Sequence, residues 1–124
     1  MDRSKNPIID TPAKAAAEFA FIKDEMREHF VCMTLDAANR KIAVRVISIG
    51  TLTASFVHPR EVFVDAILDR AASIVVGHNH PSGNLTPGAS DLRTTDRIQK
   101  AGIILGIPLI YHILMSQRGH ALIL

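Results

Sequence analysis

Apolar and polar residues alternate along this chain in blocks that predict strands mixed with helices. The segment 41–49 is the clearest strand, because every second residue from Ile42 to Val46 is apolar. The alternation then slips, and Ile47 and Ile49 become the apolar positions. Either both faces are buried from there on, or a bulge near Val46 and Ile47 resets the register. Further strands are predicted at 30–35, 72–76, 108–115 and 121–124, with a short extended segment at 51–57.

Three helices are predicted between these strands. The first begins with Thr11 as its N-cap and Pro12 at the first helical position. The third begins near Ser90 and Asp91, which are both candidate capping residues. The predicted helices span about 12–26, 58–70 and 90–101.

Strands mixed with helices in this order predict the α/β class, with a mixed β-sheet packed in a sandwich. At 124 residues the chain is long enough for one domain with a substantial core. Apolar residues make up 48% of the chain and aromatic residues 5%, so the core is expected to be aliphatic. Residues 1–10 are polar and are expected to form a loose lead-in to a single domain at 11–124.

Composition argues against several classes of protein. The single cysteine, Cys32, cannot form an internal disulfide and lies in an apolar run, so a cytoplasmic location is expected. No apolar run approaches the roughly 20 residues needed to span a bilayer, and the first residues do not resemble a signal peptide. We therefore expect no membrane partner. The net charge of +2 is too small to indicate a nucleic-acid partner.

Two histidines and an aspartate stand out in the segment 77–91. If His78 and His80 still lie in extended chain, the period of two places both imidazoles on one side. Asp91 can return a carboxylate to the same place from the start of the third helix. Two imidazoles and a carboxylate are a ligand set of catalytic zinc, which leaves the fourth position to water. Alternatively, Asp91 is a plain helix cap worth about 1 kcal/mol, and the two roles are compatible because a carboxylate has two oxygens.

These residues also carry a resemblance to a known family. His78-Asn79-His80-Pro81, followed after nine further residues by Asp91, resembles the metal motif of the JAB/MPN (JAMM) metallopeptidase superfamily. The fuller string HNHPSG, with Pro59-Arg60-Glu61 upstream, resembles the bacterial RadC family, whose members are often labelled DNA repair proteins. The resemblance runs from about Phe19 to His112. It implies a JAB/MPN-like fold, also called cytidine deaminase-like, in which about three helices flank a mixed sheet.

The resemblance further implies a chemistry. His78, His80 and Asp91 would hold Zn²⁺, and a glutamate would act as the base that accepts a proton from water. The family places this glutamate just before the first strand, which Glu28 matches. Glu61 is the rival, although its setting is that of a carboxylate at a helix start. The implied activity is hydrolysis of a peptide or isopeptide bond in a peptide or protein substrate.

Three more residues are expected to support the site without binding the metal, namely Ser82, Ser90 and His112. The chain departs from the superfamily pattern at Gly88, where a serine usually helps to stabilise the tetrahedral intermediate. The missing donor would slow catalysis unless Ser82 or Ser90 replaces it. Alternatively, glycine is needed at this position because the loop after Pro87 requires a positive φ.

Two other hypotheses come from different classes of function. In the first, the chain is a non-enzymatic module for DNA repair or protein interaction that keeps a structural metal site. In the second, it is a scaffold without metal. A basic stripe on the third predicted helix could contact phosphates, although three such charges on one face are typical of a solvated surface. Its residues are Arg93, Arg97 and Lys100. The oligomeric state is not indicated.

Overall fold

The computed structural model describes residues 2–50 and 57–124. The predicted extended segment at 51–57 therefore lies outside the described residues, except for Val57. The elements in chain order are α1 (Pro12–Glu18), a 3₁₀ turn (Ala20–Ile22), β1 (His29–Leu35), β2 (Lys41–Ile49), α2 (Pro59–Leu68), β3 (Ser73–Asn79), α3 (Ala89–Leu105), β4 (Leu109–Ser116) and β5 (Gly119–Leu122).

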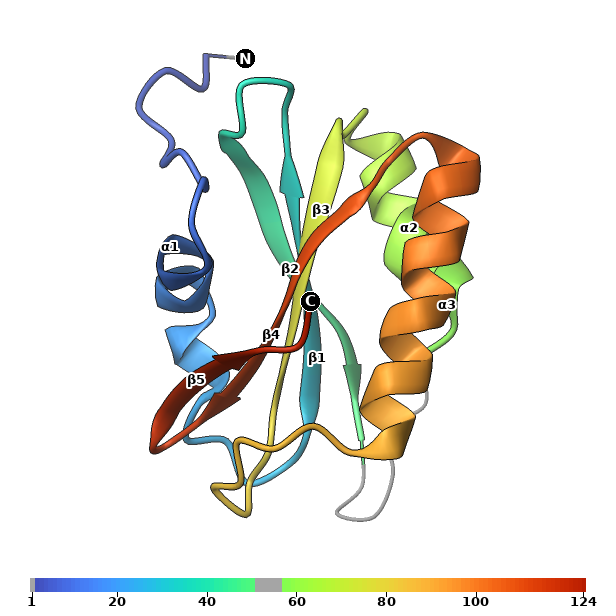
Figure 1. Cartoon of the computed structure of the whole chain (residues 1–124). Helices are drawn as coiled ribbons and strands as arrows, with labels where there is room; N and C mark the ends of the chain where they lie inside the picture. The colour runs from blue at the N-terminus through green and yellow to red at the C-terminus, as the bar shows by residue number, and fades with distance from the viewer. Residues whose placement is uncertain (1, 51–56) are drawn as a thin grey trace.

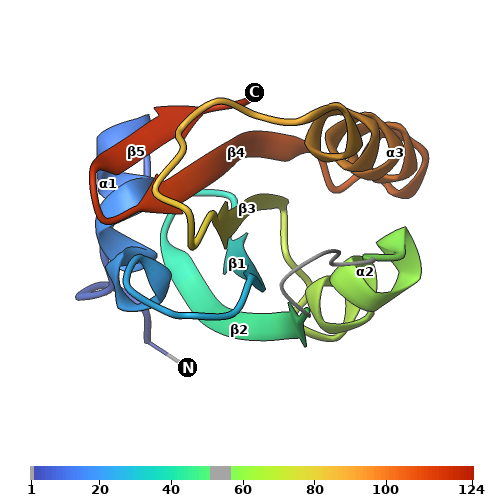
Figure 2. The same cartoon turned by 90° about the horizontal axis from the view of Figure 1, so that it is seen from below.

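The five strands form one mixed sheet in the order β2-β1-β3-β4-β5. β1 is antiparallel to both β2 and β3, β3 is parallel to β4, and β4 and β5 form an antiparallel hairpin. α1 covers one face of the sheet, and α2 and α3 cover the other (Figures 1 and 2). The predicted α/β class with a mixed sheet is therefore confirmed.

The two central strands are buried on both faces, because each face has its own apolar cluster. On the side of α2 and α3, Phe30 and Cys32 of β1 pack with residues such as Phe63 and Ile98. The alternate residues of β1, which include Val31 and Met33, pack on the side of α1. Every residue of β3 is buried, which explains why its apolar run at 74–76 shows no alternation.

The slip in the apolar pattern of β2 is a bulge. Phe30 of β1 pairs with Ser48, and the next residue, Val31, pairs with Val46, so Ile47 has no partner in the register. A second irregularity follows between Thr34 and Leu35. Of the two alternatives drawn from the sequence, the bulge near Val46 and Ile47 is confirmed.

The first helix is shorter than predicted. Its start is confirmed, because the Thr11 hydroxyl accepts a hydrogen bond from the Lys14 backbone N–H at 3.2 Å. The helix nevertheless ends at Glu18 instead of about Met26, and a 3₁₀ turn follows. Phe19 and Ile22 are both fully buried on the sheet. Side chains three residues apart lie on one face of a 3₁₀ turn, so the tighter winding buries both.

The expectation of a loose lead-in is wrong for its second half. Ile9 is only 2% exposed, and its backbone N–H donates to the Asn39 carbonyl at 2.8 Å. Ile8 forms a β-bridge with Arg40, and the Lys41 N–H donates to the Pro7 carbonyl. Burial of one isoleucine and these backbone bonds hold the segment on the turn between β1 and β2.

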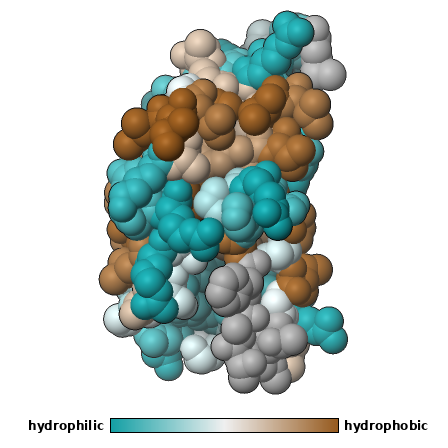
Figure 3. Space-filling model, turned by 90° about the vertical axis from the view of Figure 1, so that its right-hand side faces the viewer, coloured by the Kyte–Doolittle hydropathy of each residue, from teal (hydrophilic) through white to brown (hydrophobic). Residues whose placement is uncertain are grey.

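The outer faces of α2 and α3 carry exposed apolar side chains, which contribute to the brown surface on this side of the molecule (Figure 3). They include Val64, Ile67, Leu68, Ile103 and Ile104. Within the described ranges, no helix combines the length and apolar character needed to cross a bilayer.

We expect Gly77→Ala to destabilise the fold, because a Cβ at Gly77 would lie 2.5 Å from Cδ2 of the fully buried Phe19 ring. Overpacking of this kind costs about 1–3 kcal/mol, which urea denaturation would measure as a lower midpoint. A smaller side chain at position 19 should relieve the contact. Gly77→Ala combined with Phe19→Leu should therefore be less destabilised than the sum of the single variants. If the losses of stability in the two single variants simply add in the double variant, the Phe19 ring is not what excludes a side chain at position 77.

Candidate metal centre

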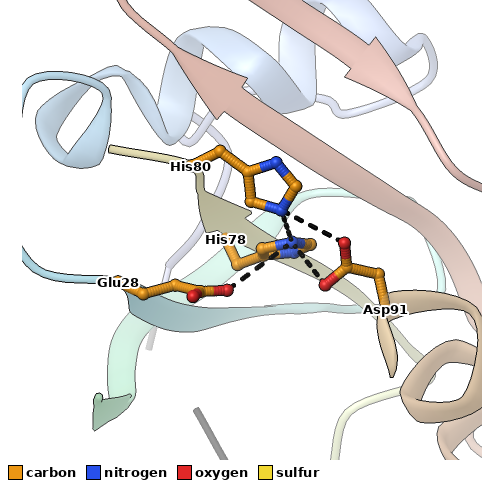
Figure 4. Close-up of side chains that lie close together, drawn as sticks. All are labelled: Glu28, His78, His80 and Asp91. Atoms are coloured by element: carbon orange, nitrogen blue, oxygen red, sulfur yellow. Dashed lines mark hydrogen bonds and ion pairs between the residues drawn. The ribbon is translucent and has the colours of Figure 1, made fainter. Parts of the chain in front are cut away.

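The candidate site lies at the end of the sheet where β3 stops and α3 begins, at the bottom of Figure 1. His78 is near the end of β3, and His80 follows one residue after that strand. Asp91 lies in the first turn of α3, and Glu28 directly precedes β1. Because β1 runs antiparallel to β3, with Phe30 opposite His78, the start of β1 reaches the same end of the sheet. Figure 4 shows the four side chains converging.

Three of these side chains form a compact set of donor atoms. The Nε2 atoms of His78 and His80 are 3.2 Å apart. The Asp91 carboxylate places Oδ1 3.1 Å from His78 Nε2 and Oδ2 3.1 Å from His80 Nε2. Bonds of about 2.0–2.1 Å to a tetrahedral metal separate the donor atoms by about 3.3 Å. The spacing therefore fits a metal ion bound by two imidazoles and a carboxylate.

Glu28 belongs to the same cluster but stands farther away. One donor atom from each of the four residues lies within 4.8 Å of the others, so the group could hold a metal ion. Glu28 Oε1 is 4.0 Å from His78 Nε2, longer than the other three separations. Its side chain is 23% exposed, beside a hollow of about 480 Å³ that Glu28, His80 and Asp91 help to line. This position suits a group that acts on a molecule in the hollow.

The carboxylate of Asp91 and the imidazole of His80 shift one another's pKa towards the charged forms. Burial disfavours the ionised form of Asp91, but hydrogen bonds from His78 and His80 outweigh it and hold the carboxyl pKa well below its usual range. The hydrogen bond to Asp91 raises the pKa of His80, against the effect of its partial burial. A carboxylate that stays ionised is the form that binds a cation.

His112 supports His78 from the interior. It is fully buried, and its Nε2 lies 2.8 Å from Nδ1 of His78. Its Nδ1 lies 2.6 Å from the Thr95 hydroxyl, which donates to the Asp91 carbonyl at 2.8 Å. Burial, and after it the charge of His78, lowers the pKa of His112 to about 3, so this imidazole is neutral.

The donor and acceptor roles in the hydrogen bonds that link Thr95, His112 and His78 follow from one another, and they are compatible with metal binding. The Thr95 hydroxyl gives its proton to the Asp91 carbonyl, so it must accept a proton from Nδ1 of His112. Nε2 of His112 then has a free lone pair and accepts from Nδ1 of His78. Because Nδ1 of His78 is engaged with His112, Nε2 is the ring nitrogen that remains to bind a metal ion. Partners of this kind fix the tautomer of a ligating histidine.

Asp91 also caps α3, although the cap differs from the prediction. The helix begins at Ala89 with Gly88 as its N-cap, so Ser90 already lies within the first turn. Oδ2 of Asp91 accepts a hydrogen bond from the Gly88 N–H at 2.7 Å. The same carboxylate thus caps the helix and faces both histidines, as the sequence allowed.

Gly88 is not required by its backbone conformation. Its φ is −83°, and an added Cβ would meet only Asp91 Oδ2, at an ordinary 3.6 Å. The alternative that this glycine needs a positive φ is therefore wrong. A serine would fit at this position, which is a favourable one for serine because it is an N-cap.

The remaining candidates lie around the cluster or outside it. Ser82 and Ser90 line the hollow, but within the described residues neither hydroxyl is hydrogen-bonded to the four cluster side chains. Ser82 Oγ instead accepts from the Asn84 N–H at 3.3 Å. Glu61 is exposed in the first turn of α2, 3.8 Å from Arg60, and is not part of the cluster.

The sequence analysis missed two residues that contact this site. Thr95 lies one helical turn after Asp91, and this i, i+4 spacing places both on one face of α3. Asn79 stands between the two histidines, where the period of two turns its side chain to the opposite side. The spacing of each residue was available as a signal, but their partners lie far away in the sequence.

We expect Thr95→Val to weaken metal binding, because His112 would lose the acceptor that fixes its tautomer. Loss of such a supporting partner typically costs about 10–100-fold in metal affinity. Titration of the metal-free protein with Co²⁺ or Zn²⁺ against a competing chelator measures this. Thr94→Val, which makes the same change at the adjacent position, is the control. Equal affinities in the two variants would mean that Thr95 does not act on the ligand set.

Comparison with known proteins gives one family. Residues 9–122 match the family model described as "RadC-like JAB domain". A UPF0758 protein of Methanospirillum hungatei is 46% identical over 101 residues, covering 82% of this chain and 45% of the relative. Those of Rubrobacter xylanophilus and Shouchella clausii are 43% and 42% identical, over 90% and 89% of this chain and 49% and 48% of the relatives. The chain thus spans about half the length of these curated relatives.

Proposed function

The chain belongs to the RadC-like JAB domain family, which is related to metalloproteases, and we propose on that basis that it is a zinc-dependent hydrolase of peptide or isopeptide bonds. One observation carries the proposal. Two imidazole nitrogens and a carboxylate lie 3.1–3.2 Å from one another, while the carboxylate of Glu28 stands 4.0 Å from the nearest of them. These distances support a set of three metal ligands with a separate base.

We assign His78, His80 and Asp91 as the zinc ligands. Nitrogen and oxygen donors in a set of three are typical of catalytic zinc, whereas structural sites are usually closed by four protein ligands. The single cysteine, Cys32, is buried elsewhere, in the core facing α2 and α3. When bound, zinc would lower the pKa of a water molecule to about 7 and polarise the substrate carbonyl.

Glu28 is the proposed general base. Its carboxylate would accept a proton as the water oxygen attacks the carbonyl carbon of the scissile amide. It would then give that proton to the amide nitrogen as the C–N bond breaks, which releases an amine and a carboxylic acid that ionises by losing its proton to the solvent. Its place directly before β1, with an accessible side chain beside the hollow, supports this role.

The substrate we propose is a peptide or protein segment that enters the hollow at the end of β3. A cytoplasmic location remains our proposal for the compartment. The basic stripe on α3 gives little support to a nucleic-acid partner, because Lys100 is paired with Asp96 at 2.9 Å. The competing hypothesis is a non-enzymatic module with a structural metal, and loss of the base distinguishes the two.

We expect one zinc ion per chain in protein purified without chelators. His80→Ala removes one nitrogen donor and should reduce the zinc content several-fold, as elemental analysis would measure. His120→Ala, at an exposed histidine of β5, is the matched control and should keep its zinc. Equal zinc in all three proteins would contradict the assignment of His80.

We expect Glu28→Gln to keep zinc and the fold but to lower turnover by about 10²–10⁴-fold, because an amide cannot accept the proton. Turnover would be measured on internally quenched peptides and on peptides joined through a lysine side chain.

Glu61→Gln serves as the control and should retain activity. A large loss of turnover in Glu61→Gln, with none in Glu28→Gln, would show that Glu61 is the base. No turnover by the zinc-loaded wild type would favour the non-enzymatic module.

A further inference from the structure

Asn79 is the central residue of the stretch His78-Asn79-His80, and its side chain points away from the metal cluster. It is fully buried, and among the described residues its side-chain amide bonds to the segment before and at the start of β1. The amide Oδ1 accepts from the His29 backbone N–H at 2.6 Å. The amide Nδ2 donates to the carbonyls of Arg27 and Glu25 at 3.0 and 3.2 Å.

These bonds hold the two residues that flank Glu28 in the sequence, Arg27 and His29. Residues 23–28 form neither helix nor strand, and residues 23–27 are exposed to solvent. Such a segment has little apolar burial of its own to fix the backbone. Asn79 supplies a buried anchor at both neighbours of Glu28, and the Gly50 N–H adds one bond to the Glu28 carbonyl at 2.8 Å.

We propose that Asn79 is a positioning residue that clamps the turn carrying Glu28 and so holds its carboxylate at the distance required of the base. This inference rests on the proposed function, because it assigns Asn79 a part in the same hydrolysis. The stretch His78-Asn79-His80 then has two tasks. Its histidines face the metal on one side, and its asparagine fixes the base from the other.

The clamp explains why asparagine suits this position. The side-chain amide has one acceptor and two donor hydrogens, and the turn offers it one N–H and two carbonyls. Aspartate has the same shape but would place an oxygen against the two carbonyl oxygens. A misplacement of a reacting group by about 1 Å costs on the order of 10²-fold in rate. Asn79→Asp and Asn79→Ala should therefore lower kcat by about that factor and leave the zinc content unchanged.

Two measurements together test the clamp. Amide hydrogen exchange on the zinc-free protein reports the turn without reference to activity, and the His29 N–H should exchange about tenfold faster or more in Asn79→Ala. The Val31 amide, farther along β1, should keep its protection. Asn6→Ala is the control, because Asn6 also donates its side-chain amide to a backbone carbonyl, that of Lys41 at 2.8 Å. It should change neither His29 exchange nor kcat.

The second measurement asks whether Asn79 acts through Glu28. In the Asn79→Ala background, Glu28→Gln should cost far less than in the wild type, because the base is already misplaced. Asn79→Asp gives the same comparison if Asn79→Ala does not fold. Unchanged His29 exchange, independent effects of the two substitutions, or loss of zinc together with activity would each overturn the proposal. If the wild type cuts no peptide, the catalytic role fails with the proposed function, and His29 exchange alone then decides whether the clamp exists.

Discussion

The antiparallel register that places Phe30 opposite His78 is the constraint on which the site depends. It brings the residue before β1, Glu28, to the end of β3, fifty positions later in the chain. Side chains alternate along a strand, so a slip of one residue would turn His78 away from the cluster. Burial of β1 and β3 on both faces makes such a slip costly, because it would move the side chains of each core to the opposite face, where they do not fit the close packing.

Around this register, the interior is arranged so that a polar site can exist beside an aliphatic core. Phe30 stacks on the His78 ring with an interplanar angle of 11° and meets His112 edge-on, so both imidazoles are held by apolar packing as well as by hydrogen bonds. An unpaired polar atom buried here would cost several kcal/mol, on the order of 2–7. The bond between His78 and His112 and the bond between His112 and Thr95 remove that cost, and they leave Nε2 of His78 directed into the cluster.

Local sequence patterns predicted most strands and the candidate metal-binding cluster. They failed for features that depend on contacts between residues far apart in the sequence. The slip in the apolar pattern of β2 and the two histidines on one side follow from a period of two, which neighbouring residues reveal, although the sequence left open whether a bulge causes the slip. The early end of α1 does not, because it depends on how Phe19 fits over Gly77 of a distant strand. The partners of Thr95 and Asn79 likewise come from other elements, so spacing alone could mark these residues but not give their roles. Ile9 was missed for the same reason, since its burial requires the turn between β1 and β2.

The most direct test of the metal centre is a crystal structure with anomalous diffraction measured on both sides of the zinc absorption edge. We expect one zinc peak per chain, within about 2.0–2.2 Å of Nε2 of His78, Nε2 of His80 and the Asp91 carboxylate. The carboxylate of Glu28 should lie beside the ion without a direct bond to it. A crystal of protein loaded with Zn²⁺ that gives no peak at these residues, or that shows Glu28 as a direct ligand, would contradict the separation of ligands and base.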